Sequence, residues 1–104
     1  MTDLLDRISA LLGDSTGDLD TIEHTLTDGY ACALALEAER WRLERRMRGL
    51  SKGLENGDTA EKVHELSSLT KRLDGNQDDL TVLRRRLAEL RRRADDVRVG
   101  CPSR

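Results

Sequence analysis

The sequence predicts an all-α fold: an antiparallel coiled-coil helical hairpin preceded by a short N-terminal helix. Two heptad runs place an apolar residue at every third and fourth position, which is the pattern of a coiled-coil seam. Between the runs stands the short sequence Glu55-Asn56-Gly57-Asp58, and a connection this short makes neighbouring helices antiparallel. The charges also change sign in blocks that match when the chain folds at Gly57.

Leucine dominates both seams. In the first run the seam positions are Leu19, Leu26, Ala33, Arg40, Met47 and Leu54, and Ile22, Gly29, Leu36, Leu43 and Leu50. In the second run they are Leu66, Leu73, Leu80, Leu87 and Ala94, and Leu69, Asn76, Leu83, Leu90 and Val97. Folding at Gly57 brings Arg40 and Asn76 within about a turn of each other, so we expect a buried polar layer that sets the register.

The charge distribution supports the hairpin independently of the leucines. The net charge is −2, which favours neither nucleic acid nor an acidic substrate. The blocks, however, carry −8 over 1–39, +5 over 40–54, −4 over 55–79 and +5 over 80–104. Folding at Gly57 lays each block against one of opposite sign. Charged residues make up 37% of the chain, which has one proline and no phenylalanine, as is typical of long helices.

The N-terminal segment predicts a short amphipathic helix over residues 1–13. Thr2 and Asp3 are suitable N-cap residues, and the apolar residues that follow recur with helical spacing. Residues 14–17 are polar and end at a glycine, so we expect a linker there.

The hairpin is expected over residues 18–99, with helices at about 18–54 and 59–98. The tip takes 55–58, where Gly57 suits the left-handed position after a helix, and the second helix begins at a capping-box-like sequence. Heptad phase continues across Asp74–Asp79, so this helix is expected to be weakened there but continuous; the alternative is a break near Gly75 followed by a fourth helix. Residues 100–104 are expected to form a disordered tail.

Tyr30, Leu34 and Trp41 are apolar residues that the seams do not explain. Helical spacing places them on the flank and outer face of the first long helix, in an alanine-rich stretch. We interpret them as an interaction face for a second copy or another helical protein, because exposed aromatic residues are frequent binding hot spots. Two hairpins would then form a four-helix bundle. The short helix is long enough to cover Tyr30 but not Trp41, which alternatively lies over the arginine stems of its own hairpin.

No sequence motif indicates catalysis or a cofactor. Glu61 and His64 have the spacing of a carboxylate-bridged metal motif, but the motif occurs once and the heptad phase points His64 to solvent. We therefore expect no metal site and no enzyme activity. Cys32 and Cys101 are too far apart in the hairpin for a disulfide, which favours reduced thiols in the cytoplasm.

The resulting hypothesis is a non-catalytic protein–protein interaction or assembly module, homodimeric and cytoplasmic. No segment approaches the ~20 apolar residues of a membrane span. The alternative is a regulator of a large enzyme or nucleic-acid complex. Glu55 and Asp58 give the tip two carboxylates, and the hairpin resembles coiled-coil factors that reach into the secondary channel of bacterial RNA polymerase with an acidic tip.

Two outward-facing arginines offer a polyanion contact for that alternative. Arg85 and Arg92 are the middle residues of two arginine triplets and point away from the seam. The triplets lack interleaved aromatic residues for base stacking, so nucleic acid is not the expected partner.

Overall fold

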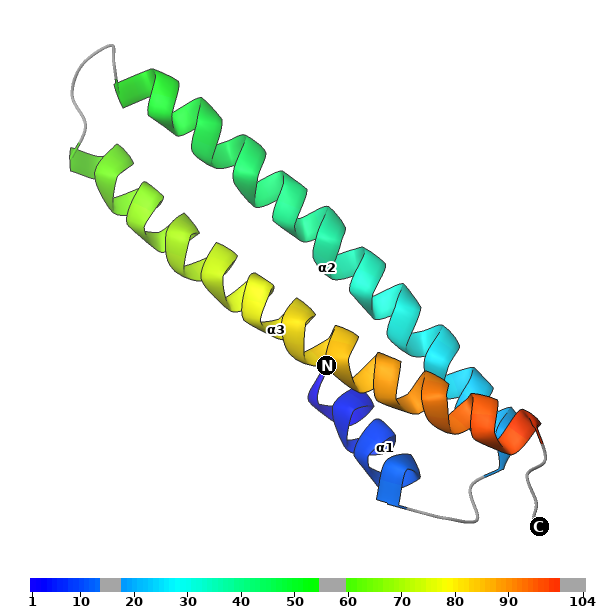
Figure 1. The fold of residues 1–104 in the computed structure, drawn as a ribbon. Helices are drawn as coiled ribbons and strands as arrows, with labels where there is room; N and C mark the ends of the chain where they lie inside the picture. Colours follow the sequence, from blue (N-terminus) through cyan, green and yellow to red (C-terminus); the bar gives the residue numbers. More distant parts are fainter. Residues whose placement is uncertain (14–17, 55–59, 100–104) are drawn as a thin grey trace. The chain divides into compact units, whose positions relative to one another are not determined.

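The computed structural model describes residues 1–13, 18–54 and 60–99, and these residues are all-α. The helices are α1 (Thr2–Gly13), α2 (Leu19–Leu54) and α3 (Ala60–Arg98). Helices α2 and α3 run antiparallel beside each other, which confirms the predicted hairpin with its short N-terminal helix (Figure 1). The predicted linker, tip and tail lie outside the described residues.

Contacts divide the chain into two compact units. The three-helix unit comprises Met1–Leu34 and Thr81–Arg104, and thus contains α1, the start of α2 and the end of α3. The two-helix unit comprises Ala35–Leu80, with the end of α2 and the start of α3. Each unit is described below by itself.

The core of the three-helix unit is the predicted seam together with one face of α1. The buried apolar side chains are Leu4, Ile8, Ile22, Leu26, Leu83, Leu87, Leu90 and Ala94. Six of these eight are seam residues of α2 and α3, and the other two come from α1. Glu23 of α2 and Arg98 of α3 form an ion pair with the signs that the charge blocks predict.

Helix α1 docks on the flank of α2 that carries Thr25 and Asp28. Leu4 and Ile8, one turn apart, are buried, while Arg7 donates hydrogen bonds to Asp28 Oδ2 at 2.9 Å and to Thr25 Oγ1 at 3.4 Å. Thr25 is only 1% exposed although it lies outside the seam. Helical geometry places Tyr30 on the other side of α2, so α1 does not cover it. Leu4, Ile8 and Thr25 are the buried residues on this flank, and the exposed Arg7–Asp28 ion pair lies beside them.

The two-helix unit has a narrower core. Leu43, Leu69 and Leu80 are buried together with the polar Asn76, and the neighbouring seam leucines are half-buried. Helix α3 is continuous through Asp74–Asp79. Ion pairs that join α2 to α3 here include Arg46 with Glu65 at 2.7 Å and Glu39 with Arg72 at 3.2 Å.

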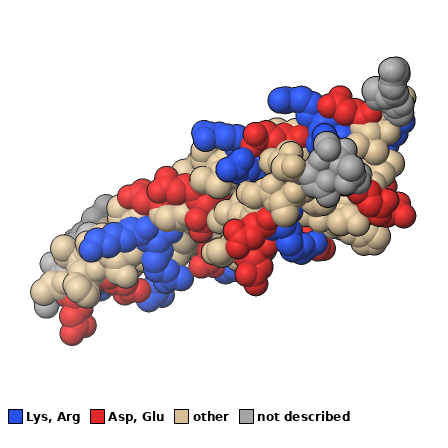
Figure 2. Space-filling view, turned by 90° about the horizontal axis from the view of Figure 1, so that it is seen from below, with Lys and Arg blue, Asp and Glu red and all other residues tan. Residues whose placement is uncertain are grey.

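The visible surface mixes both signs of charge. Figure 2 shows basic and acidic side chains next to one another across the face. Many of the ion pairs lie between side chains that are largely exposed, where a single pair contributes little stability. We therefore attribute stability to the leucine seams and assign the charges to pairing specificity.

Candidate interaction surfaces

The three-helix unit carries an open groove beside Tyr30, which we call the Tyr30 groove. It has a volume of about 320 Å³ and is lined by Tyr30, Ala33, Arg84, Leu87, Ala88 and Arg91. Small apolar side chains form its floor, and the two arginines come from α3. Tyr30 is 42% exposed, and Leu34, one turn further along α2, is 67% exposed. The expected contact residues of this unit are therefore accessible.

Helix α2 approaches α3 closely next to this groove. Gly29 occupies a seam position and is buried. A Cβ atom there would lie 3.3 Å from Leu87 Cγ and closer still to Leu87 Cδ2. The missing side chain therefore makes room for Leu87, whose side chain also lines the groove.

Trp41 lies in the two-helix unit and is 67% exposed. Arg45, Arg48 and Lys52 follow it at four, seven and eleven residues, spacings that place all four side chains on one face of α2. We call these four residues the Trp41 face. All are exposed, and the three cations form no ion pair with any residue that the structure describes. Trp41 is thus largely uncovered by its own unit.

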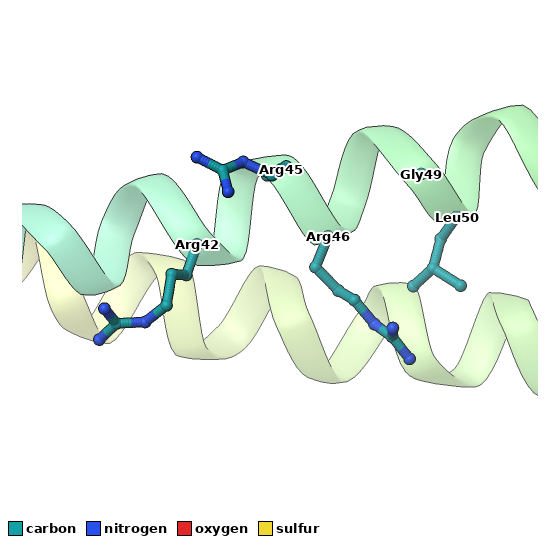
Figure 3. Close-up of a pocket in the computed structure, with 5 residues that line it drawn as sticks. All are labelled: Arg42, Arg45, Arg46, Gly49 and Leu50. Carbon is teal, nitrogen blue, oxygen red and sulfur yellow. The ribbon is translucent and has the colours of Figure 1, made fainter.

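An arginine-lined pocket adjoins the Trp41 face. Its volume is about 470 Å³, and its lining residues are Arg42, Arg45, Arg46, Gly49 and Leu50. In Figure 3, Arg46 extends toward α3 whereas Arg45 points away from it. Gly49 has no atom within 4 Å of the position that a Cβ would occupy, so the pocket is open above it. This pocket was not predicted from the sequence, although the spacing of its three arginines along α2 was a visible signal.

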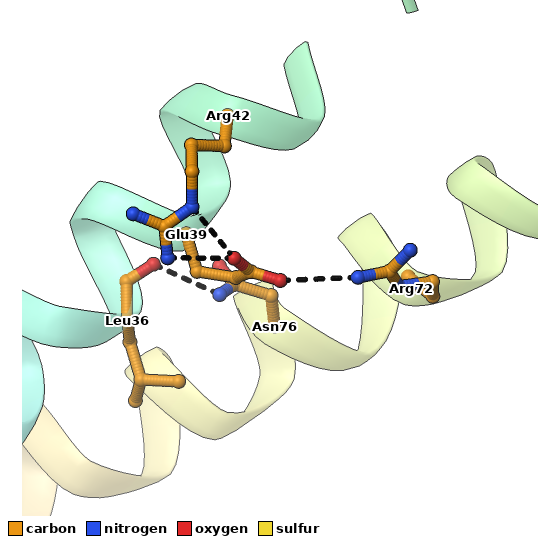
Figure 4. Close-up of polar contacts among 5 residues, drawn as sticks. All are labelled: Leu36, Glu39, Arg42, Arg72 and Asn76. Carbon is orange, nitrogen blue, oxygen red and sulfur yellow. Dashed lines mark hydrogen bonds and ion pairs between the residues drawn. The ribbon is translucent and has the colours of Figure 1, made fainter. Parts of the chain in front are cut away.

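Glu39 links the two helices of this unit. Its Oε1 accepts hydrogen bonds from Arg42 Nε at 3.1 Å and Nη2 at 2.8 Å, and its Oε2 accepts one from Arg72 Nη2 at 3.2 Å (Figure 4). The hydrogen bond from Arg42, with the positive charges of Arg42 and Arg72, lowers the pKa of the Glu39 carboxyl. Glu39 thus remains ionised and holds Arg42 in place.

The buried polar layer expected from Arg40 and Asn76 contains Asn76 but not Arg40. Asn76 is 6% exposed and donates from Nδ2 to the carbonyl oxygen of Leu36 at 2.9 Å (Figure 4). Arg40 instead forms an ion pair with Glu44, one turn along the same helix, at 3.4 Å. A long arginine side chain can leave a seam and reach solvent, whereas a short asparagine cannot. The buried layer thus pairs Asn76 with a backbone carbonyl.

Replacing Asn76 with leucine is expected to raise the free energy of unfolding by about 1–3 kcal/mol. The Oδ1 atom of Asn76 is buried without a hydrogen-bond partner, and leucine removes that cost while extending the apolar seam. Urea denaturation followed by circular dichroism measures the change. A loss of stability would show instead that the bond to Leu36 outweighs the unpaired oxygen.

The remaining predicted site residues are exposed or outside the described chain. Arg85 and Arg92 are exposed on α3, and Glu55 and Asp58 of the tip lie outside the described residues. Cys32 is a half-buried free thiol, and Cys101 is not among the described residues.

Over 1–13, 18–54 and 60–99, no group of three His, Cys, Asp or Glu side chains is placed to hold a metal ion. None of the helices described combines the length and apolar character needed to cross a bilayer.

The fold and these surfaces define a class: an all-α helical hairpin protein with exposed aromatic side chains on α2. Comparison with models of protein families, with curated proteins and with solved structures gave no match.

Proposed function

We propose that this protein is a non-catalytic interaction module that forms a homodimer through the Tyr30 groove. The observation that carries the proposal is the groove itself, which has an apolar floor, an exposed tyrosine and two arginines. Tyrosine and arginine around a pocket are the residues most often found at the energetic centres of protein interfaces.

The position of α1 supports this choice of surface. Within the three-helix unit, α1 covers the flank of α2 at Thr25 and Asp28. The flank with the Tyr30 groove has no such cover among the residues described in this unit. A helix from a second chain would therefore complete the packing on that side.

Charge complementarity favours a second copy as the occupant. Residues 19–34 of α2 contain three acidic residues and no lysine or arginine, whereas residues 81–98 of α3 contain seven arginines and three acidic residues. A two-fold contact brings the same surface of each copy together. If α2 of each chain lies beside α3 of the other, both acidic segments meet basic ones, and the pair forms a four-helix bundle.

Substitution at the groove is expected to weaken dimerisation by about tenfold or more. Tyr30→Ala removes the aromatic side chain that lines the groove, and Leu34→Arg adds a cation beside the groove, at a 67%-exposed position one turn along α2 that a partner helix would cover. Light scattering over a concentration series measures the molar mass, and circular dichroism checks that each variant is folded.

Ala31→Arg is the matched control, since it adds the same charge to an exposed position of α2 that lies about 100° around the helix from Tyr30. We expect it to keep the mass of the unmodified protein. A chain that stays monomeric at high concentration would contradict the proposal, as would two groove variants that retain the dimer mass.

The regulator hypothesis has one supporting observation, the exposure of Arg85 and Arg92 without ion pairs to the described residues. It requires salt-sensitive binding to a polyanion through these side chains. The variant Arg85→Glu with Arg92→Glu tests it, and this variant also serves as a control below.

A further inference from the structure

We propose that the Trp41 face and its adjoining arginine pocket bind an acidic amphipathic helix of a different protein. This surface belongs to the two-helix unit, whereas the Tyr30 groove belongs to the three-helix unit. The inference therefore goes beyond homodimerisation and rests on separate residues.

The first support is uncompensated positive charge around an exposed aromatic ring. Arg45, Arg48 and Lys52 share the outer face of α2 with Trp41 and make no ion pair with the described residues. Glutamates spaced three or four residues apart on a partner helix would meet these cations in register. Charge-assisted bonds to carboxylates are stronger than neutral hydrogen bonds.

The second support is the donor geometry inside the pocket. Arg42 bonds to Glu39 through Nε and Nη2, and Arg46 bonds to Glu65 through the same two atoms. A guanidinium has five N–H donors, so the Nη1 group of each arginine can still donate to another carboxylate. The two glutamates also hold the arginine side chains in position before a ligand arrives, which reduces the entropy lost on binding.

The third support is the apolar part of the pocket. Leu50 is half-buried, and the space above Gly49 has no atom within 4 Å of the missing Cβ. A leucine or methionine of the partner helix could enter this space while its glutamates contact Arg45 and Arg48. The pocket thus fits a ligand that is apolar on one side and acidic on the other.

A nucleic acid strand and a membrane fit this surface less well. Single-stranded nucleic acid is held by successive stacking aromatic residues, and Trp41 is the only tryptophan of the chain. A membrane-surface helix needs a broad apolar face, whereas Arg45, Arg48 and Lys52 occupy the face around Trp41. An acidic amphipathic helix would pair with the cations and also fill the apolar part of the arginine-lined pocket at Gly49 and Leu50.

The single tryptophan provides a direct test with the full chain. The probe is a synthetic helical peptide with leucines on one face and glutamates on the other, and its control peptide has glutamine in place of glutamate. We expect the acidic peptide to change Trp41 fluorescence in a saturable way, while the glutamine peptide does so at least about tenfold more weakly.

Two variants with equal charge change separate a specific site from general attraction. Arg45→Glu with Arg48→Glu is expected to weaken peptide binding by about tenfold or more, whereas Arg85→Glu with Arg92→Glu leaves it within about twofold. Gly49→Met fills the pocket without altering charge and should also weaken binding. Equal weakening by both double variants, or no effect of Gly49→Met, would overturn the proposal.

The same fluorescence titration distinguishes an acidic helix from a nucleic acid and a membrane, and light scattering distinguishes it from a second copy of this chain. Tighter binding of a deoxythymidine oligonucleotide or of phosphatidylserine vesicles than of the acidic peptide would overturn the proposal. If Arg45→Glu with Arg48→Glu lowers the molar mass from that of a dimer to that of a monomer, the Trp41 face binds a second copy, which would also overturn the proposal. If dimerisation fails but peptide binding remains, only the proposed function is lost.

Discussion

Replacing Leu83 with alanine is expected to lower the free energy of unfolding by about 2–5 kcal/mol. Leu83 has no exposed surface and belongs to the seam that packs the three-helix unit. Alanine removes buried apolar surface and leaves a cavity that the surrounding helices fill only in part. Urea denaturation followed by circular dichroism measures this loss, which is a large share of the total stability of a small domain.

The adjacent residue supplies the control for Leu83. Val82 is an apolar residue on the same helix but is 42% exposed. Val82→Ala is expected to change stability by no more than about 0.5 kcal/mol, since it loses little buried surface and gains helix propensity. Equal losses for the two variants would contradict the seam that we assign to α3.

Replacing Gly29 with alanine is expected to destabilise the protein, although alanine is the better helix former. The added Cβ would clash with the Leu87 side chain, which is buried and has little room to move. Overpacking of a well-packed core costs about 1–3 kcal/mol, while the gain in helix propensity is about 1 kcal/mol. The expected net effect is therefore a loss of stability of up to about 2 kcal/mol, measured as a lowered urea midpoint.

Gly75→Ala makes the same chemical change where the structure leaves space. Gly75 lies within α3 and has no atom within 4 Å of its missing Cβ. Alanine there is expected to add about 1 kcal/mol of stability through helix propensity alone. If alanine stabilises the protein equally at both glycines, the space between Gly29 and Leu87 is large enough for a Cβ atom, which would contradict the close approach of α2 to α3.

The surfaces were only partly predictable from the sequence. Tyr30, Leu34 and Trp41 stood out because they are apolar and lie outside the heptad seams, and the structure leaves all three exposed. The pocket beside Arg45 was not predicted. Its shape depends on where Arg42 and Arg46 extend, which their bonds to two glutamates decide.

The polar seam residues Arg40 and Asn76 were also only partly predictable from the sequence. Heptad position indicated that both Arg40 and Asn76 would be buried. Only Asn76 is buried, since arginine can follow its long aliphatic stem out to Glu44. Heptad periodicity predicts the direction of the Cα–Cβ bond, but it does not predict where the charged end of a long side chain lies.

By itself, the sequence determined the helical hairpin. The repeated apolar seam, the short connection and the matching charge blocks are all satisfied by one arrangement, two long helices packed antiparallel. Only the tertiary structure decided which side of α2 the N-terminal helix covers, and why Gly29 must stay small. Both depend on individual contacts, of Arg7 with Asp28 and of Gly29 with Leu87, between residues far apart in the chain. Such contacts follow from shape and charge in three dimensions, which no repeat in the sequence encodes.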